Sequence, residues 1–228
     1  MNTARGPRAS PSDPGRRHRH PLTPAASAAF AFAALTAALT AGGLAPLPGD
    51  SSLTQAAVDH RPGAVVAALQ VVTATGTGFA PYLLAATAGL ILAGRRPRTR
   101  TAQVVLACVG WLALGQAVRF GLMTLIARPR PPEADWLTHA SRHAYPSGHA
   151  TTSAMAAGLI VAALISRRPR GHRAWIALTL AWAAAVGASR VWLGVHWTTD
   201  VIAGWLLALT WTALAVAAAA RIHTEGAA

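Results

Sequence analysis

The 228-residue sequence contains one cysteine, no lysine and only seven acidic residues. The single cysteine, Cys108, excludes a disulfide-stapled fold. Charged residues make up 12% of the chain, against about a quarter in typical soluble domains. Hydrophobic residues make up 53%, which excludes disorder over most of the length. The net charge of +13 comes from an excess of arginine, which is compatible with a nucleic-acid-binding protein or with a membrane protein.

Long apolar segments decide between these two classes. Some are shorter than the ~20 residues that a membrane crossing needs, but flanking residues can complete them. We therefore predict an all-α, polytopic membrane protein with about six transmembrane helices in a domain at 22–221. For residues 50–77 we expect an interfacial or partly inserted helical stretch, with a seventh span as the alternative. The six predicted spans are 22–45, 78–93, 102–126, 150–165, 174–188 and 201–220.

The two ends of the chain are polar. Residues 1–21 hold five arginines among proline, serine and glycine, which is typical of a disordered basic tail. Residues 222–228 form a second, short tail. The apolar segment at 22–45 could also be a signal peptide, because small residues lie near 43–45 after a basic start. The basic stretch before it is long for a signal peptide, which favours a retained first helix.

The arginines are distributed unevenly between the two sides of the predicted bundle. Fourteen of the twenty lie in the N-terminal tail, in the segments 95–100 and 167–173, and at Arg221. By the positive-inside rule these segments and both termini are cytoplasmic, in a cell membrane. The segments 127–149 and 189–200 then face the extracytoplasmic side. Because this distribution accounts for the basic charge, we expect the lipid bilayer as a partner and no nucleic acid.

Three polar clusters occur at the predicted outer ends of these helices. Thirty-nine residues separate His149 from Ser189, about two crossings and a turn, so both return to one face of the membrane. Fourteen residues separate Pro131 from Pro146 with no apolar run between them, which brings the first cluster to the same face. The clusters are Arg128-Pro129-Arg130-Pro131-Pro132, Pro146-Ser147-Gly148-His149, and Ser189-Arg190 followed by His196 and Asp200.

The residue types in these clusters suit phosphoryl transfer without a metal. Arginine binds phosphate oxygens through two parallel hydrogen bonds. Ser147 and Gly148 fall at a predicted helix start, where free N–H groups and the helix dipole favour an anion. His196 and Asp200 are four residues apart, so on a helix the carboxylate can orient the imidazole and leave its other nitrogen free to attack. His149, from another helix, can then act as general acid and base.

These residues resemble the phosphatidic acid phosphatase type 2 superfamily, the lipid phosphate phosphatases that share an active site with vanadium haloperoxidases. Its signature is Lys-x6-Arg-Pro, then Pro-Ser-Gly-His, then Ser-Arg-x5-His-x3-Asp. The second part matches at 146–149 and the third at 189–200 without exception. The first part matches only in Arg130-Pro131, because Met123 occupies the lysine position. The similarity in motifs covers about residues 100 to 200.

The resemblance implies a phosphohistidine mechanism. His196 would be the nucleophile, Asp200 its orienting partner, and His149 the acid that protonates the leaving oxygen. The phosphate would be held by Arg130, Arg190, Ser147 and Gly148. No metal or other cofactor is implied.

The lysine missing at Met123 leaves one phosphate contact unassigned. Arg119 lies one helical turn deeper on the same face and could extend outward to supply the charge, with a structural ion pair as its alternative role. Arg128 is a second candidate for this contact.

Several other polar residues of the outward segments have simpler interpretations. We expect solvated residues or substrate-edge contacts at His139, Arg142 and His143 rather than catalysts. Glu133 and Asp135 are expected to be solvated rather than to bind metal. Tryptophans at helix ends, including Trp192 and Trp197, are expected to anchor those ends at the membrane interface.

The sequence thus predicts an integral membrane, metal-independent lipid phosphatase with an extracytoplasmic active site. Its substrate would be a phosphate monoester or pyrophosphate of a lipid, of the polyprenyl pyrophosphate or phosphatidic acid type. One alternative is a phosphotransferase that uses the same site. Another is a transporter or structural membrane protein with degenerate catalytic residues. The shared active site also predicts that vanadate inhibits the protein.

Overall fold

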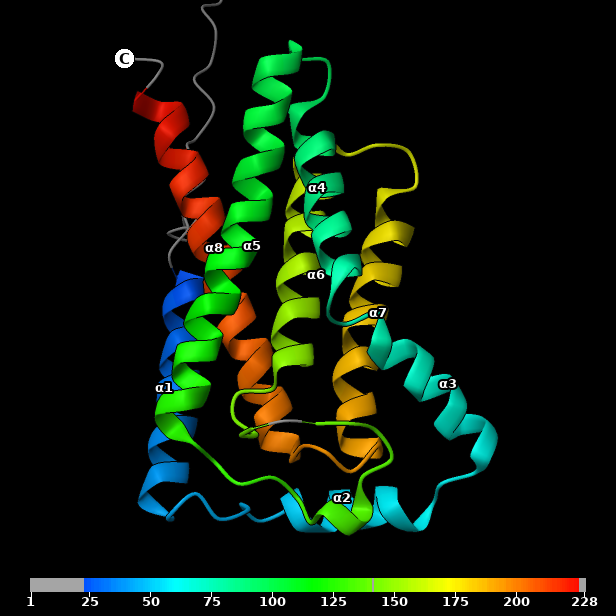
Figure 1. Ribbon diagram of the computed structural model, residues 1–228. Helices are drawn as coiled ribbons and strands as arrows, with labels where there is room; N and C mark the ends of the chain where they lie inside the picture. Colours follow the sequence, from blue (N-terminus) through cyan, green and yellow to red (C-terminus); the bar gives the residue numbers. More distant parts are fainter. Residues whose placement is uncertain (1–22, 141, 226–228) are drawn as a thin grey trace, which may run out of the picture.

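The computed structural model of the chain describes residues 23–140 and 142–225, and in these residues it contains helices and no strand (Figure 1). The all-helical fold class is thereby confirmed. The tail predicted at 1–21 and residues 226–228 lie outside the described residues, and the last helix continues past the predicted end at 221. The helices are α1 (Thr23–Ala41), α2 (Asp50–Asp59), α3 (Gly63–Ala74), α4 (Phe79–Ala93), α5 (Arg98–Ile126), the 3-10 helix η1 (Glu133–Asp135), α6 (Gly148–Arg167), α7 (His172–Trp192) and α8 (Thr198–Glu225).

Five of these helices, α1, α5, α6, α7 and α8, are long and apolar enough to cross a membrane. The remaining predicted span, 78–93, corresponds to α4, whose 15 residues cover about 22 Å at 1.5 Å per residue. That is shorter than a hydrocarbon core of about 30 Å. Together with α3 it passes the same length and composition test, as a pair bent by 53°. The sixth candidate span is therefore this bent pair, whose geometry is that of a broken span or a re-entrant loop, and the described residues contain no seventh candidate.

The bend has a local cause in the four residues between α3 and α4. Gly78 has a φ of +66°, which a residue with a side chain adopts only at a cost, and the segment also contains Gly76. The stretch 50–77, expected to be interfacial or partly inserted, comprises two helices. α2 lies across one end of the bundle, whereas α3 inclines against α7 (Figure 1). The turn between α3 and α4 therefore lies inside the bundle's height rather than at its end.

The interior of the bundle is built around α6, which packs against α4, α7 and α8. Its core side chains include Met155, Leu159 and Leu164, and small residues such as Ala163 allow the neighbouring helices to approach closely. Large apolar side chains on the outer faces are exposed, as Leu125 of α5 shows at 83%. Such exposed leucines suit a helix face that contacts lipid.

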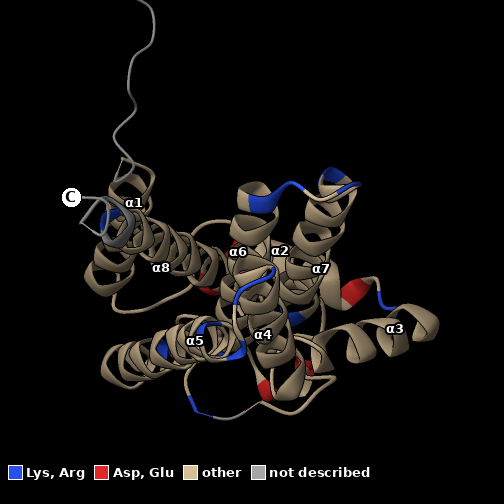
Figure 2. Cartoon of the chain, turned by 90° about the horizontal axis from the view of Figure 1, so that it is seen from above, with Lys and Arg blue, Asp and Glu red and all other residues tan. Residues whose placement is uncertain are grey.

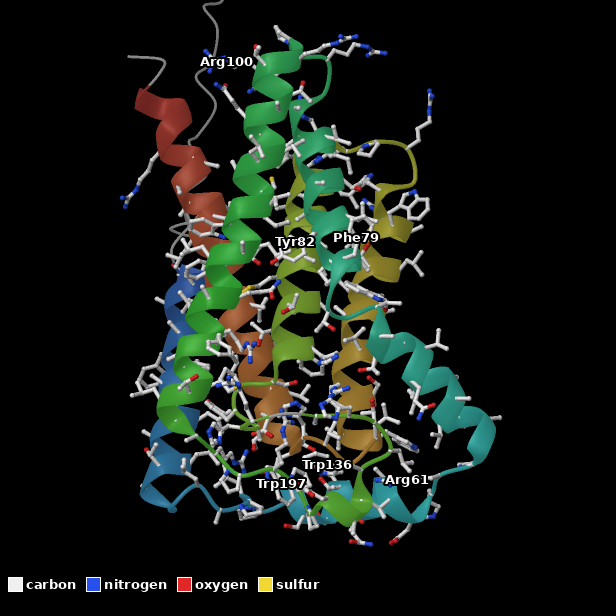
Figure 3. The ribbon with its side chains drawn as sticks, viewed as in Figure 1. Arg61, Phe79, Tyr82, Arg100, Trp136 and Trp197 are labelled. Atoms are coloured by element: carbon white, nitrogen blue, oxygen red, sulfur yellow. The ribbon has the colours of Figure 1, made fainter. Side chains whose placement is uncertain are left out.

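The two ends of the bundle differ in composition. The α4–α5 and α6–α7 loops carry arginines at the end seen from above in Figure 2. Arg100 lies at this end, whereas Trp136 and Trp197 lie at the opposite end beside α2 (Figure 3). The α5–α6 and α7–α8 connections, which hold the three polar clusters together with the adjoining ends of α6, α7 and α8, also lie at that opposite end (Figure 1). The clusters are therefore separated from the arginine-rich loops by the length of the bundle.

The segment that leads into α6 is fixed by α1 and α8. The hydroxyl of Tyr145 lies 2.8 Å from Thr36 Oγ1, and its ring stacks on Phe32 with the centroids 5.9 Å apart. Burial raises the pKa of Tyr145 to about 12, so the phenol stays neutral. The backbone N–H of Ser147 donates to the carbonyl oxygen of Asp200 at 3.0 Å. α1 thus packs against α8 and against the segment that leads into α6.

Candidate active site

His196 and Asp200 form a buried pair at the junction of α7 and α8. His196 Nδ1 lies 3.3 Å from Asp200 Oδ2, and the backbone N–H of Trp197 donates to the same oxygen at 2.9 Å. The two side chains are 2% and 0% exposed. Because α8 begins at Thr198, His196 precedes the helix. The pairing expected from the spacing is present, but the α7–α8 loop makes it by folding back onto the first turn of α8.

Arg130 fixes the tautomer of His196. Its Nη1 donates to the carbonyl oxygen of Val195 at 2.6 Å and lies 2.9 Å from His196 Nε2. A guanidinium can only donate, so Nε2 must be the acceptor and the ring proton resides on Nδ1, toward Asp200. His196 therefore presents an Nε2 lone pair on the side away from its carboxylate.

The charge states of these two groups follow from burial and from their neighbours. Burial lowers the pKa of His196 well below its usual range, and the charges of Arg130, Arg190 and His149 lower it further. Burial also lowers the pKa of Arg130, to about 10, which leaves the guanidinium cationic near neutral pH. The site thus combines a neutral imidazole with a cationic guanidinium against it.

The Pro-Ser-Gly-His cluster forms the N-terminal end of α6. Ser147 precedes the helix, is fully buried, and has no hydrogen-bond partner for its Oγ within the described part of the chain. Gly148 is the first residue of the helix. A Cβ atom at Gly148 would lie 3.2 Å from Arg119 Cζ, so a side chain here would press on that guanidinium. A free hydroxyl, exposed helix N–H groups and an arginine therefore converge at this end of α6.

His149 and Arg190 complete the ring of polar groups from α6 and α7, and α3 with the turn after it supports them. His149 Nε2 lies 3.3 Å from Thr77 Oγ1, in the turn between α3 and α4. Arg190 Nη1 donates to Thr73 Oγ1 of α3 at 2.9 Å, whereas its Nε is buried without a partner in the described residues. The bend between α3 and α4 thus brings two threonines to the site.

These side chains surround a pocket of about 330 Å³. Its described lining contains no Asp or Glu, because Asp200 lies behind His196. A cavity with several guanidinium groups and no acidic lining attracts a phosphate anion. The polar residues that line it are Thr77, Gln116, Arg119, Arg130, His139, Arg142, His149, Thr152, Arg190 and His196.

Arg119 and Met123 line this pocket together, one turn apart on α5. Arg119 Nη1 lies 3.2 Å from Met123 Sδ, and Arg119 Nε is buried without a partner among the described residues. The described part of the chain shows no acidic partner for Arg119, so the ion-pair alternative has no counterpart there. A cationic group thus occupies the pocket wall beside the position where the signature has lysine.

Arg128 points away from the pocket. Nη1 donates to Asp200 Oδ1 at 2.5 Å and to Thr199 Oγ1 at 2.8 Å, and Nη2 donates to Asp50 Oδ2 at 2.9 Å. The backbone carbonyls at 44 and 45 accept the remaining two N–H groups at 3.3 Å each. All five donors of a guanidinium are therefore engaged, and none is left for a phosphate. Of the two candidates for the missing contact, only Arg119 lines the pocket.

Of the other polar residues in the α5–α6 connection, some line the pocket and some do not. His139 and Arg142 line the pocket, and Arg142 lies over the ring of Phe120, with Cζ 5.4 Å from the ring centroid. The pocket lining does not include His143, Glu133 or Asp135. Within the described residues no group of three or more side chains could hold a metal ion.

The expectation that Trp197 is an interfacial anchor is wrong. Its side chain is only 9% exposed, and Nε1 donates to the carbonyl oxygen of Pro129 at 3.1 Å. The indole thus ties the α5–α6 loop to the α7–α8 loop. Trp192 is 36% exposed, as an anchoring residue would be.

Several residues at or beside the site were not predicted from the sequence. Asp50, Thr73 and Thr77 come from the stretch 50–77, which lies outside the motifs. Gln116 and Phe120 come from α5. One feature of the sequence could have drawn attention to Asp50: it is one of only seven acidic residues in the chain.

Comparison with known proteins identifies relatives that are phosphatases. The undecaprenyl-diphosphatase of Sulfolobus acidocaldarius is 31% identical over 136 residues, which make up 55% of this chain and 58% of that protein. Phosphatidylglycerophosphatase B of Bacillus subtilis is 38% identical over 87 residues, or 37% of this chain and 42% of the relative. The chain thus matches less than two thirds of the length of either relative.

Solved structures share the fold. The transmembrane PAP2 type phosphatidylglycerolphosphate phosphatase from Bacillus subtilis superposes with a TM-score of 0.73 at 24% identity, over 88% of this chain and 98% of that one. LpxE from Aquifex aeolicus superposes with a TM-score of 0.55 at 18% identity, over 73% and 94%. The family model of the PAP2 superfamily matches residues 104–223, more than half of the sequence. The chain is therefore a member of the PAP2 superfamily, the phosphatidic acid phosphatase type 2 superfamily that its motifs resemble.

Proposed function

We propose that this protein is a membrane lipid phosphatase that hydrolyses its substrate through a phosphohistidine at His196. One observation carries the proposal: a neutral imidazole, with its lone pair on Nε2, faces a pocket walled by arginines. A nucleophile with a free lone pair and cations around the phosphate both favour attack on phosphorus.

In the first step the phosphate binds among Arg119, Arg130 and Arg190, at the N-terminal end of α6. Arg130 exchanges its contact with His196 Nε2 for a phosphate oxygen, which frees the lone pair. Nε2 attacks phosphorus as the bond to the lipid oxygen breaks, and protonated His149 gives its proton to that oxygen. Asp200 stabilises the positive charge that the imidazole acquires.

In the second step His149, now neutral, takes a proton from water. The resulting hydroxide attacks phosphorus, the bond between phosphorus and His196 Nε2 breaks, and inorganic phosphate leaves. His196 returns to its starting state, with its proton on Nδ1, and His149 is protonated again. The roles of His149 in the two steps are the reverse of each other, as a general acid and base requires. The arginines supply the charge stabilisation, so we propose that no metal takes part.

The substrate is proposed to be a lipid phosphate monoester or pyrophosphate, presented at the extracytoplasmic surface. The positions of the arginine-rich loops support this orientation, because the pocket is at the opposite end of the bundle. The names of the relatives support both substrate types, since one is an undecaprenyl-diphosphatase and another a phosphatidylglycerophosphatase. Both termini are then cytoplasmic.

The test is phosphate release by purified wild type and His196→Ala from a panel of lipid phosphates and pyrophosphates, with chelator present. His172→Ala, at the start of α7 and remote from the pocket, is the matched control. We expect wild type and control to release phosphate and His196→Ala to release none. Phosphate release that survives in His196→Ala, or that chelator abolishes, would overturn the mechanism. Phosphate found mainly on an added alcohol would instead identify a phosphotransferase.

A further inference from the structure

A second, fully buried charge cluster lies directly behind the proposed nucleophile. Asp50, the first residue of α2, is 2% exposed. Its carboxylate accepts hydrogen bonds from Arg128 Nη2 at 2.9 Å and from the backbone N–H and the hydroxyl of Thr199, at 2.9 and 2.6 Å. The backbone N–H of Leu47 donates to it at 3.1 Å. Four donors thus converge on the two oxygens of this buried carboxylate.

Arg128 links this carboxylate to that of Asp200. Its Nη1 donates a hydrogen bond to Asp200 Oδ1 at 2.5 Å. The other oxygen, Asp200 Oδ2, accepts from His196 Nδ1 and from the backbone N–H of Trp197. The two oxygens of Asp200 therefore have separate tasks. With Arg128 bound on one side, the carboxylate cannot rotate without breaking a buried ion pair.

The cluster contains one cation, Arg128, between two carboxylates, those of Asp50 and Asp200. Asp50 balances the positive charge of Arg128, so the negative charge of Asp200 remains available to His196. Without Asp50, the charge of Arg128 would be uncompensated and would compete with the imidazole for Asp200. The cluster thereby sets both the orientation and the effective charge of the carboxylate.

We propose that Asp50 and Arg128 are positioning residues that prepare the His196–Asp200 pair for nucleophilic attack, in a role that rests on the proposed phosphatase function. Asp50 belongs to α2, which lies outside the segment 104–223 that matches the family model. The helix that crosses the end of the bundle is then part of the catalytic apparatus, although it contributes no side chain to the pocket lining.

The expected effect falls on the chemical step rather than on binding. Attack makes His196 cationic, and Asp200 is the only carboxylate that contacts it within the described residues; its other charged or titratable neighbours are Arg130, Arg190 and His149. Replacing Asp50 with asparagine adds a net positive charge behind this group. We expect kcat to fall about 10- to 100-fold. KM should stay within about twofold, because the proposed phosphate contacts do not involve Asp50.

The test compares Asp50→Asn with Asp59→Asn, an identical change at an exposed carboxylate of the same helix that accepts from Gln55 at 2.8 Å. Thr199→Val, which removes the hydroxyl shared by Asp50 and Arg128, is a second variant without a charge change. We expect kcat to fall in Asp50→Asn and, less strongly, in Thr199→Val, with KM and the control unchanged. A lower melting temperature together with an unchanged kcat would overturn the proposal.

A direct measurement on His196 separates this proposal from the proposed function. In histidine ¹⁵N-labelled protein in detergent, the His196 resonances, assigned by their loss in His196→Ala, report the Nδ1–H bond to Asp200. They should shift in Asp50→Asn and stay in place in Asp59→Asn. If the wild type releases no phosphate, the proposed function fails, and these resonances still decide whether Asp50 positions the pair. Unshifted resonances in Asp50→Asn would refute the positioning role.

Discussion

The assignment of Arg119 as the substitute for the absent motif lysine makes a sharp prediction. Arg119 lines the pocket, its Nη1 lies 3.2 Å from Met123 Sδ, and its guanidinium carbon lies where it would meet a Cβ on Gly148. Replacing it with alanine removes one of the cations beside the phosphate. The perturbation is local, because the described part of the chain shows no ion pair that Arg119→Ala would break.

The magnitude follows from the type of contact that is lost. A charged donor aimed at the charge that develops in the transition state contributes about 2.7–4 kcal/mol, which corresponds to about 10²–10³ in kcat. In the proposed site Arg130 and Arg190 remain to bind the phosphate of the variant's substrate, so KM should rise far less than kcat falls. Arg142→Ala is the matched control, since Arg142 also lines the pocket and lies over the same Phe120 ring but is exposed. We expect it to cost less than about tenfold, as an exposed contact does.

A compensating variant tests the assignment more strictly. In Arg119→Ala/Met123→Lys, the ammonium group stands at the motif position and should recover at least about tenfold of the lost kcat. Met123→Lys alone places a second cation beside Arg119. Position 123 is only 5% exposed, so water screens the repulsion between the two charges poorly, and activity should fall. The assay is phosphate release at saturating substrate, with the melting temperature in detergent as the folding control. Equal and small effects of Arg119→Ala and Arg142→Ala, or no recovery in the double variant, would refute the assignment.

Three further predictions concern the acid, the nucleophile and the packing. His149→Gln should lower kcat about 10²–10⁴-fold for a lipid substrate and much less for an aryl phosphate whose leaving group needs no proton; equal losses would contradict the acid role. The pKa of His196 lies below its ordinary 6.5, so the nucleophile stays neutral as the pH falls through 6.5. Single-turnover phosphorylation should therefore persist below pH 6.5, and a loss centred at or above 6.5 would contradict it. Gly204→Ala, whose Cβ would lie 2.9 Å from Thr151 Oγ1, should destabilise the protein by about 1–3 kcal/mol in a melting assay, whereas Gly110→Ala, with open space around it, should not.

The motif residues were predictable because their spacing and membrane topology reinforce each other. Ser147 belongs to the α5–α6 connection, and two helices later Arg190 at the end of α7 and His196 in the α7–α8 connection return to the same end. The structure brings these residues around one pocket or directly beside it. The apolar segments likewise predicted the helices, since hydropathy is the dominant signal in a bilayer. Motif spacing and hydropathy are both local properties of the sequence, so these parts of the fold could be predicted from it.

The residues that sequence analysis missed depend on contacts between distant segments. Asp50 meets Arg128 and Thr199, which are 78 and 149 residues away, and no local pattern records such a pairing. The bend between α3 and α4 was missed because residues 63–74 are apolar but short, and only their packing against α7 separates an inclined half-span from an interfacial helix. Trp197 was misjudged for the same reason, since its partner Pro129 lies in another loop.

The most direct test of the account is the isolation of the phosphoenzyme. Wild type, mixed with a ³²P-labelled lipid phosphate and quenched within milliseconds, should carry an acid-labile and alkali-stable phosphoryl group. Peptide mapping under alkaline conditions should place it on His196, and Asp200→Asn, which removes the carboxylate 3.3 Å from Nδ1, should lower its rate of formation. A phosphoryl group on any other residue, or ¹⁸O-water entering the phosphate in a single turnover of His196→Ala, would contradict the central claim.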